Sequence, residues 1–425
     1  MGPHRSRARL RASWSRPQRG MALLMGLIMV VLISAFVTDF NYSSRVGIIT
    51  STHYRDEVKA TRLAQSGVRI YGMLLVLGRQ VSKAPMVSGM LSSLGLNIDG
   101  ASMVCKSIPF LDTAMLRYLT SIGNGMMSEQ EEDGLLNLMG LPGGGEAKEG
   151  AVPVRGSTDK NGDRDRPTVR RSLLDFEGDF KVECSDETSR IDLNGFASAA
   201  WAGLTLQQHP TALMLYGQMA GEEFDPLFEE RLKMDRWELI GNIRDWIDVD
   251  SQRGGLWGGD EDALYDDYIP RYRSKNSRLD TLAEVRLVHG VTDEVWALFS
   301  PAWSIHTKNF RVNVNTASPQ MIQAILRGFT DPLIVTDQLL AEKIPELMIE
   351  RIFLPYTKAN DFLARAKSKG IVFNQNESRI KPLLTTDSRV FRLTSTGYVN
   401  ESTRRIEMIM RVSSGHYRGL SWRNE

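Results

Sequence analysis

The residues best suited to chemistry lie in one acidic stretch, residues 245–268, which contains a single base, Arg253. Its acids are Asp245, Asp248, Asp250, Asp260, Glu261, Asp262, Asp266 and Asp267. Carboxylates packed this densely repel one another unless a cation compensates them. Calcium takes about six to eight hard oxygen ligands and is often bound by flexible loops. The stretch also contains glycines that let the backbone turn tightly. The stretch is therefore a candidate calcium site.

A second interpretation of the same residues stays open. The acids could form a solvated loop that pairs with Arg271 and Arg273, which follow shortly after. Surface ion pairs of this kind are common and need no metal. The residues alone do not choose between a calcium site and a solvated acidic loop.

Motifs of catalytic sites are missing from the sequence. It has no G-x-S-x-G, H-E-x-x-H, Walker A or C-x-x-C pattern. The six histidines are scattered along the chain. The net charge of +1, with 42% hydrophobic and 24% charged residues, is ordinary for a folded protein and gives no sign of a nucleic-acid binder. We therefore predict a protein that is not an enzyme.

A DNA-binding function is the alternative from a different class. Residues 287–291 and 314–318 both resemble parts of helix-hairpin-helix motifs, whose backbone N–H groups can hold phosphates. A membrane-anchored competence or pilus-tip protein would use them in this way. The neighbouring acidic stretch would repel phosphate, so we expect structural hairpins and no nucleic-acid partner.

The beginning of the sequence is typical of a membrane-anchored protein. Residues 1–20 contain six arginines and no acid, and residues 21–38 carry no charge. Eighteen helical residues span ~27 Å, close to the ~30 Å of a hydrocarbon core. The basic flank should stay in the cytoplasm while the rest is exported. A cleaved signal peptide, a plain signal anchor and a pilin-like leader cut between Gly20 and Met21 all remain possible, although residues 36–40 fit a signal-peptide cleavage site poorly.

The helices and strands that must position the acidic stretch can be predicted from the spacing of apolar residues along the sequence. Small and apolar residues recur at helical spacing after the apolar run: Ala60, Ala64, Gly67, Tyr71 and Leu74. They predict one amphipathic helix over residues 21–90 with a face for close packing. Alternation predicts strands within 176–200 and 386–425 and helices within 201–385. The glycine-rich residues 91–175 read as a variable linker.

This order of elements predicts an α+β fold. A pilin-type domain, made of the N-terminal helix and a small antiparallel sheet, would be interrupted by a large α-helical insertion. The insertion would contain the hairpin pieces and so be of a SAM-like or helix-hairpin-helix-like type. The two cysteines, Cys105 and Cys184, could pair in an oxidising compartment, but their spacing leaves the pairing open.

Several separate blocks of the sequence resemble one known family, the minor pseudopilin K of type II secretion systems. The blocks are residues 18–36, 189–194, 245–250 with 259–262, 282–291, 312–318 and 389–393. Most pilins and pseudopilins carry a glutamate five residues into the mature chain, where Met25 stands if the cut precedes Met21. The K family similarly lacks this glutamate. A subunit at a filament tip has no neighbour above it whose amine needs neutralising.

The resemblance has further implications for this chain. It implies cleavage before Met21 by a prepilin peptidase, a methylated mature N-terminus, and a single-pass anchor in the bacterial inner membrane with most of the chain in the periplasm. It implies assembly with minor pseudopilins I and J, other pseudopilins and the inner-membrane platform, in support of export across the outer membrane. It also implies calcium in the helical domain. The ligands that match by motif are Asp248, Asp250, Glu261 and Asp262.

Overall fold

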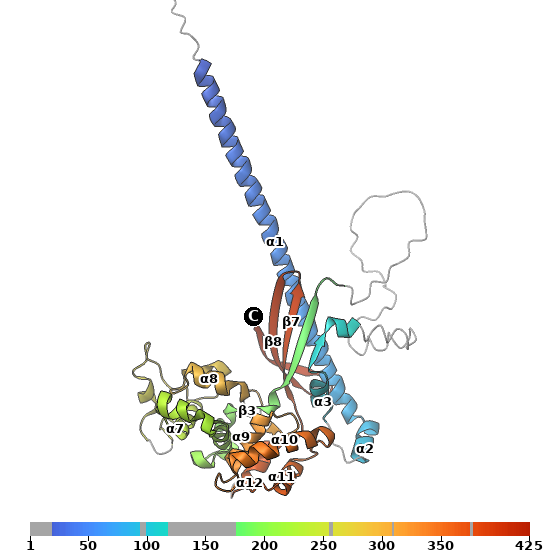
Figure 1. Ribbon diagram of the computed structural model, residues 1–425, viewed down its shortest axis with the longest axis vertical. Coiled ribbons are helices and arrows are strands. Elements are labelled where there is room, and N and C mark those ends of the chain that lie inside the picture. Colours follow the sequence, from blue (N-terminus) through green and yellow to red (C-terminus); the bar gives the residue numbers. More distant parts are fainter. Residues whose placement is uncertain (1–18, 94–98, 118–175, 255–257, 308–309, 375–376) are drawn as a thin grey trace, which may run out of the picture. The chain divides into compact units, whose positions relative to one another are not determined.

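The fold begins with one long helix, α1 (Arg19–Lys83), which is drawn in Figure 1. The computed structural model describes residues 19–93, 99–117, 176–254, 258–307, 310–374 and 377–425. Most of the expected leader therefore lies outside the described residues, and the expected cut falls at the beginning of α1. Among the described residues, one helix is long and apolar enough to cross a membrane, and it runs over Met21–Lys83.

The two parts of α1 differ in what covers them. Residues 21–55 are exposed, and within them residues 21–38 carry no charge. From Ala60 onward one face is buried, and Ala60, Ala64 and Tyr71 are fully inaccessible. At Gly397, where strand and helix touch, an added Cβ would lie 2.1 Å from the Ala60 carbonyl oxygen. The small residues thus allow the close packing that their spacing predicts.

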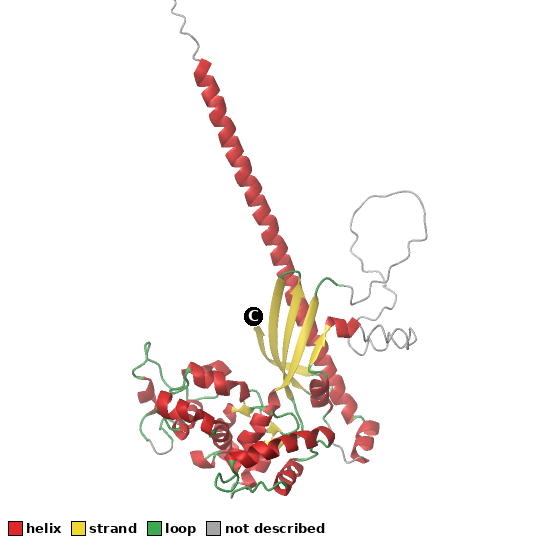
Figure 2. Ribbon diagram, in the orientation of Figure 1, coloured by secondary structure: helices red, strands yellow, loops and turns green. Residues whose placement is uncertain are grey.

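The later turns of α1 pack on a five-stranded antiparallel sheet, shown in yellow in Figure 2. The strand order is β1-β2-β7-β8-β9. The strands are β1 (Phe110–Asp112), β2 (Asp179–Asp186), β7 (Val390–Val399), β8 (Ser402–Val412) and β9 (Tyr417–Asn424). Apolar side chains alternate along the strands, so one face joins the α1 core while the other carries charges. The predicted mixed fold, a long apolar helix with an antiparallel sheet, is confirmed.

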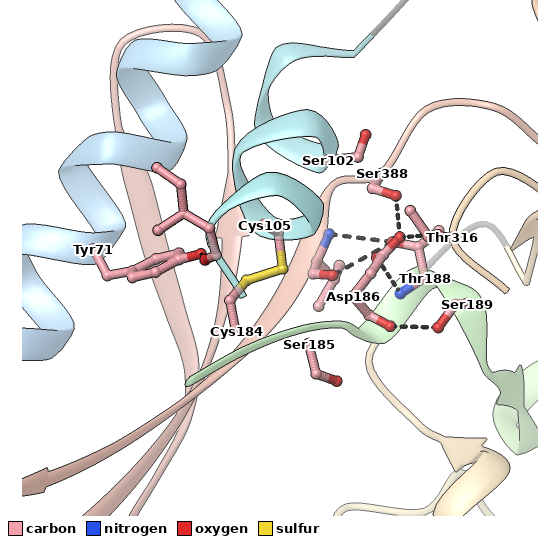
Figure 3. The surroundings of a disulfide bond; sticks show 12 residues. Tyr71, Ser102, Cys105, Cys184, Ser185, Asp186, Thr188, Ser189, Thr316 and Ser388 are labelled. Atoms are coloured by element: carbon pink, nitrogen blue, oxygen red, sulfur yellow. Dashed lines mark hydrogen bonds between the residues drawn. A yellow bond between two sulfur atoms is a disulfide. The ribbon is translucent and has the colours of Figure 1, made fainter. Parts of the chain in front are cut away.

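Part of the glycine-rich segment belongs to this sheet domain. The helices α2 (Pro85–Ser93) and α3 (Gly100–Ser107) follow α1, and β1 pairs with β2. Ala101 and Leu111 are buried in the same core as α1. Cys105 of α3 forms a disulfide with Cys184 of β2 (Figure 3), which resolves the pairing that the sequence left open. Residues 100–112 are therefore core elements, whereas the sequence placed them in a linker.

The chain between β2 and β7 is mainly helical, although these two strands are neighbours in the sheet. The helices are α6 (Pro210–Met219), α7 (Arg236–Ile247), α8 (Asp293–Phe299), α9 (Pro319–Phe329), α10 (Asp337–Phe353), α11 (Ala359–Ser368) and α12 (Glu377–Ile380). Short parallel pairs join β3 (Ile191–Asp192) to β4 (Trp303–Ser304) and β5 (Val312–Asn313) to β6 (Leu384–Thr385). This helical region has its own hydrophobic core, separate from the α1 core.

Shorter turns complete the helical region. The 3-10 turns are Glu187–Ser189, Leu193–Ala197, Ala199–Trp201, Leu206–Gln208, Glu222–Phe224, Glu261–Tyr265, Leu282–Leu287, Ser300–Ala302 and Lys381–Leu383, and Pro226–Leu232 is a π-helical turn. The helices α6 and α9 cross closely because Gly217 faces the backbone of Ala324, where an added Cβ would lie 1.9 Å from the carbonyl oxygen. That crossing lies at the centre of the helical core.

One buried carboxylate, Asp186, joins the sheet to the helical region. It ends β2 and accepts hydrogen bonds from the Thr188 N–H at 2.8 Å and from the hydroxyls of Thr316 and Ser388 (Figure 3). Burial raises the pKa of Asp186 to about 6, and these hydrogen bonds limit the rise. Because its donors come from three separated segments, Asp186 fixes the point where those segments cross.

Candidate metal centre

The acidic stretch begins on α7, which sets the position of its first two carboxylates. Asp235 starts the helix as N-cap by accepting a hydrogen bond from the Trp237 N–H at 2.7 Å. Asp245 and Asp248 lie three residues apart at the end of α7, so they share one face. The chain then returns, and Glu261 opens the next 3-10 turn beside them.

Asp245, Asp248 and Glu261, here called the carboxylate cluster, can each offer one oxygen such that all three oxygens lie within 4.8 Å of one another. Asp245 is 4% exposed and Glu261 only 1%. The Gly254 N–H lies 3.1 and 3.2 Å from the two oxygens of Asp245, and Arg244 Nε donates to Asp248 at 3.2 Å. Two buried carboxylates and the half-buried Asp248 thus lie close together, and the basic group hydrogen-bonded to them is Arg244.

Two oxygens of the carboxylate cluster lack any hydrogen-bond partner. They are Asp248 Oδ1 and Glu261 Oε1, and both are buried. The Ser274 hydroxyl bonds only the other oxygen of Glu261, at 3.2 Å. Since buried polar atoms are nearly always satisfied, these two oxygens indicate a missing partner.

The pKa values of the three carboxylates in the cluster are also raised. Burial, followed by the charges of Asp245 and Asp248, raises the pKa of Glu261 to about 8. Burial also raises the pKa of Asp245 to about 7 and that of Asp248 to about 6. Burial is the largest cause of all three shifts, and repulsion between neighbouring acids adds to it, so the charged forms of these carboxylates are disfavoured. The donor set consists of hard carboxylate oxygens, so the residues present fit a calcium ion.

The ligands predicted from the sequence fall into two pairs. Asp248 and Glu261 lie in the carboxylate cluster. Asp250 is exposed and accepts a hydrogen bond from the Gln252 N–H at 2.9 Å. Asp262 accepts a hydrogen bond from the Ser274 N–H at 3.1 Å, and it shares the one proton of the Ser274 hydroxyl with Glu261. The structure thus brings together two of the four and separates the other two from the group of three.

Asp245 completes the carboxylate cluster, although the sequence did not single it out as a ligand. Its spacing from Asp248 on a predicted helix was the signal that could have found it. The arginines of the alternative interpretation engage other acids. Arg271 pairs with Asp266 at 2.5 Å, and Arg273 lies 3.6 Å from Asp262. They compensate the outer acids, while the carboxylate cluster keeps its unpartnered oxygens.

The two hairpin pieces use their polar groups inside the fold. In the first, Gly290 turns the chain with φ of 90° before α8, and Asn242 Nδ2 donates to the His289 carbonyl at 3.2 Å. In the second, the Asn315 side chain holds both backbone groups of Tyr356 at 2.9 Å. Both contacts stabilise neighbouring segments of the helical region.

The structure thus combines a helix that is apolar and long enough to cross a membrane with an antiparallel sheet on which the later turns of this helix pack. A family model described as "Type II secretion system (T2SS), protein K" matches residues 189–306. The matched residues include the whole carboxylate cluster. This match confirms the predicted resemblance, and residues 189–306 carry the domain of the type II secretion protein K family.

Two proteins that are similar to this chain are also called type II secretion system protein K. The type II secretion system protein K of Aeromonas hydrophila is 29% identical over 101 residues, which are 24% of this chain and 30% of that protein. The protein K of Klebsiella pneumoniae is 32% identical over 83 residues, which are 19% of this chain and 25% of that protein. The matches therefore span less than a third of the length of these curated relatives.

A solved structure also aligns with the chain. It is the crystal structure of the GspK-GspI-GspJ complex from the type 2 secretion system of enterotoxigenic Escherichia coli. The alignment has 20% identity and a TM-score of 0.45, and it covers 59% of this chain and 80% of the other.

Proposed function

We propose that this chain is a minor pseudopilin of a type II secretion system, without enzymatic activity, at the tip of the pseudopilus. It supports protein export across the outer membrane from an anchor in the inner membrane. The observation that carries the proposal is the protein K family match over residues 189–306, in a chain that begins with a membrane-length apolar helix.

Processing is the first part of the proposal. A prepilin peptidase cuts between Gly20 and Met21, and the new N-terminus is methylated. The arginines of the leader, followed directly by the apolar run, support this cut. N-terminal sequencing and intact-mass measurement of the membrane-inserted protein should give a chain that begins at a methylated Met21. Gly20→Asp should keep the leader attached, and a mature chain that begins beyond residue 38 would refute the cut.

Assembly is the second part. We propose that the chain binds minor pseudopilins I and J, with other pseudopilins and the inner-membrane platform as further partners, and that most of it lies in the periplasm. Residues 21–38 of α1 are exposed and carry no charge, so they offer a surface for lipid and for neighbouring helices. Co-purification of the full chain with I and J tests this. A chain that stays alone with both, and whose deletion leaves secretion intact, is not a tip subunit.

The tip position rests on Met25 and on the helical region. A subunit in mid-filament that lacks a carboxylate at this position would leave a neighbour's amine unpaired in a low-dielectric core. The helical region adds bulk that should obstruct a further subunit above it. Met25→Glu should leave membrane insertion intact, and in cross-linking it should allow the chain to appear below other subunits, where the native chain does not.

Calcium is the remaining part. We propose that Asp245, Asp248 and Glu261 hold a calcium ion through carboxylate oxygens, with Asp250 and Asp262 close by in the same stretch. The ion would supply the positive charge that the buried carboxylates lack. Its role is structural, because it would tie the end of α7 to the turn at Glu261.

We propose a structural role for the two helix-hairpin-helix-like pieces as well. Their internal contacts through Asn242 and Asn315 support this role. A salt-dependent DNA-binding measurement on the full chain separates it from the alternative of a DNA-binding competence protein. Clear binding at moderate salt would favour the alternative.

A further inference from the structure

The face of the sheet that points away from α1, here called the outer face, is built largely from complementary charges. On β8 the side chains of Ile406, Met408 and Met410 enter the core, so those of Glu407 and Arg411 lie on the outer face. Glu407 stands opposite Arg423 of β9. Arg392 of β7 lies beside them and donates to Glu407 at 3.2 Å. Charges directly opposite each other stabilise a sheet when their signs differ.

One cross-strand pair departs from this pattern. Arg411 of β8 stands directly opposite Arg418 of β9. Within the registers of the five described strands, this is the one pair that sets like charges opposite each other. Like charges in this position destabilise a sheet, so the pair is a local cost for the free chain.

The charged neighbours increase the excess of positive charge. Arg389 directly precedes β7 and adjoins Val390, which is the cross-strand partner of Arg411. Side chains alternate along a strand, so the Arg389 side chain begins on the other face of the sheet, level with Val412. The acid in reach is Asp387, and it is already shared by Arg389 at 2.9 Å and the buried Arg79 at 2.7 Å. Burial first, then the charges of Arg418 and Arg389, lower the pKa of Arg411.

The guanidinium groups of Arg411 and Arg418 have few hydrogen-bond acceptors within the described residues. Arg411 donates to the backbone carbonyl of His306 at 3.2 Å, and in the described part of the chain neither Arg411 nor Arg418 pairs with a carboxylate. Arginine forks match carboxylates with two parallel hydrogen bonds, which a single carbonyl cannot provide. Arg411 and Arg418 thus lack a carboxylate partner among the described residues, whereas Arg389 has one in Asp387.

We propose that Arg411 and Arg418, here called the arginine corner, dock a carboxylate-rich segment of another protein. The partner's acids would relieve the repulsion between Arg411 and Arg418, which no described residue does. The strand β9 is an edge of the sheet, so an extended acidic segment can approach it from the side. This inference stands on the sheet alone and does not depend on the proposed function.

The first test concerns the repulsion itself. In the full chain, Arg418→Glu should raise Tm by on the order of 1 °C, because it turns a like-charged pair into an ion pair. The matched control is Arg423→Glu on the same strand, which stands opposite Glu407 and lies 3.8 Å from Glu425. This control should lower Tm. A lower Tm for Arg418→Glu would overturn the premise.

The second test measures docking on the full chain in a zwitterionic detergent, with a hexaglutamate peptide and inorganic phosphate as probes. The native chain should bind the peptide, and Arg418→Gln and Arg418→Glu should each weaken binding about tenfold or more. Arg423→Gln should change the affinity less than about twofold. Phosphate should compete weakly.

Three outcomes would overturn the proposal. The native chain could fail to bind hexaglutamate, or Arg423→Gln could weaken binding as much as Arg418→Gln does. Phosphate at equal concentration could displace the peptide completely, which would identify a small-anion site and not a protein docking surface.

Discussion

Two buried carboxylate centres in this chain differ in how their oxygens are satisfied. Asp186 receives hydrogen bonds from a backbone N–H and two hydroxyls. The carboxylate cluster of Asp245, Asp248 and Glu261 has two buried oxygens with no partner. Both centres show raised pKa values, so the direction of the shift alone does not tell them apart.

The difference indicates what each centre is for. A carboxylate whose donors all come from the protein is complete, and its role is to hold segments together. A group of carboxylates that lacks donors offers its oxygens to a cation, which is the role we propose for the carboxylate cluster. The carboxylate cluster should therefore respond to calcium while Asp186 should not, and mutations can test this contrast.

The largest expected effect is at Asp186. Asp186→Ala leaves the hydroxyls of Thr316 and Ser388 and the Thr188 N–H buried without an acceptor, so the free energy of unfolding should fall by roughly 3–5 kcal/mol. Urea unfolding with calcium and with a chelator should give the same loss. Asp186→Asn, which keeps one acceptor oxygen, should lose less. A loss that depends on calcium would break the contrast between the two centres.

Calcium itself should give the next largest effect. A ligand at a hundred times its Kd stabilises the folded form by about 2.7 kcal/mol. Thermal melts of the native chain should therefore shift upward with calcium. Glu261→Gln should abolish most of this shift and should raise Tm in chelator, because it removes a carboxyl group whose charged form is disfavoured by burial and by the neighbouring acids. The control is Asp267→Asn, an exposed acid of the same stretch, which should leave the shift unchanged.

The pH dependence in chelator should be smaller. The pKa of Glu261 is raised to about 8 and that of Asp245 to about 7, so the folded chain holds protons that the unfolded chain has released. Stability is then fully present below pH 4 and is lost as the pH rises toward 8. The loss that disappears in Glu261→Gln should be on the order of 2 kcal/mol. Saturating calcium should flatten this part of the curve, and an unchanged curve would contradict the carboxylate cluster as its source.

The smallest effect separates the two pairs of ligands that the sequence predicted. Asp248→Asn removes a carboxylate of the cluster and should weaken calcium binding about tenfold. Asp250→Asn changes an exposed side chain outside the cluster and should change the Kd less than about twofold. Calorimetric titration of both variants measures the difference. If both variants lost calcium affinity equally, Asp250 would have to be counted as a calcium ligand.

The helices and strands that have a clear pattern of apolar residues over neighbouring positions could be predicted from the sequence. The face with Ala60, Ala64 and Tyr71 follows from helical spacing, and the strands of residues 386–425 follow from alternation. The pairing of β2 with β7 could not be predicted in the same way, because about two hundred residues separate the partners. The strand β1 was missed because it is three residues long and borders a glycine-rich segment.

The candidate site was predictable in composition and less so in geometry. The density of acids identified the stretch. Which acids meet depends on how the chain turns after α7. Asn276 holds the Asp250 carbonyl at 2.7 Å, and the Asp250 carboxylate remains exposed. Asp245 stays buried because it sits one turn earlier on the helix. The path of the chain after α7 depends on contacts with residues such as Asn276, which lie far along the sequence, so local sequence patterns cannot predict it.

The disulfide between Cys105 and Cys184 closes a loop of the chain with a sequence separation of 79 residues. A protease that cuts once anywhere inside this loop would leave two fragments joined by one covalent bond. On a gel without reductant the nicked protein would run as a single species, and reductant would release two. The α3 helix would keep its attachment to β2 after the cut, because that attachment does not depend on an unbroken loop.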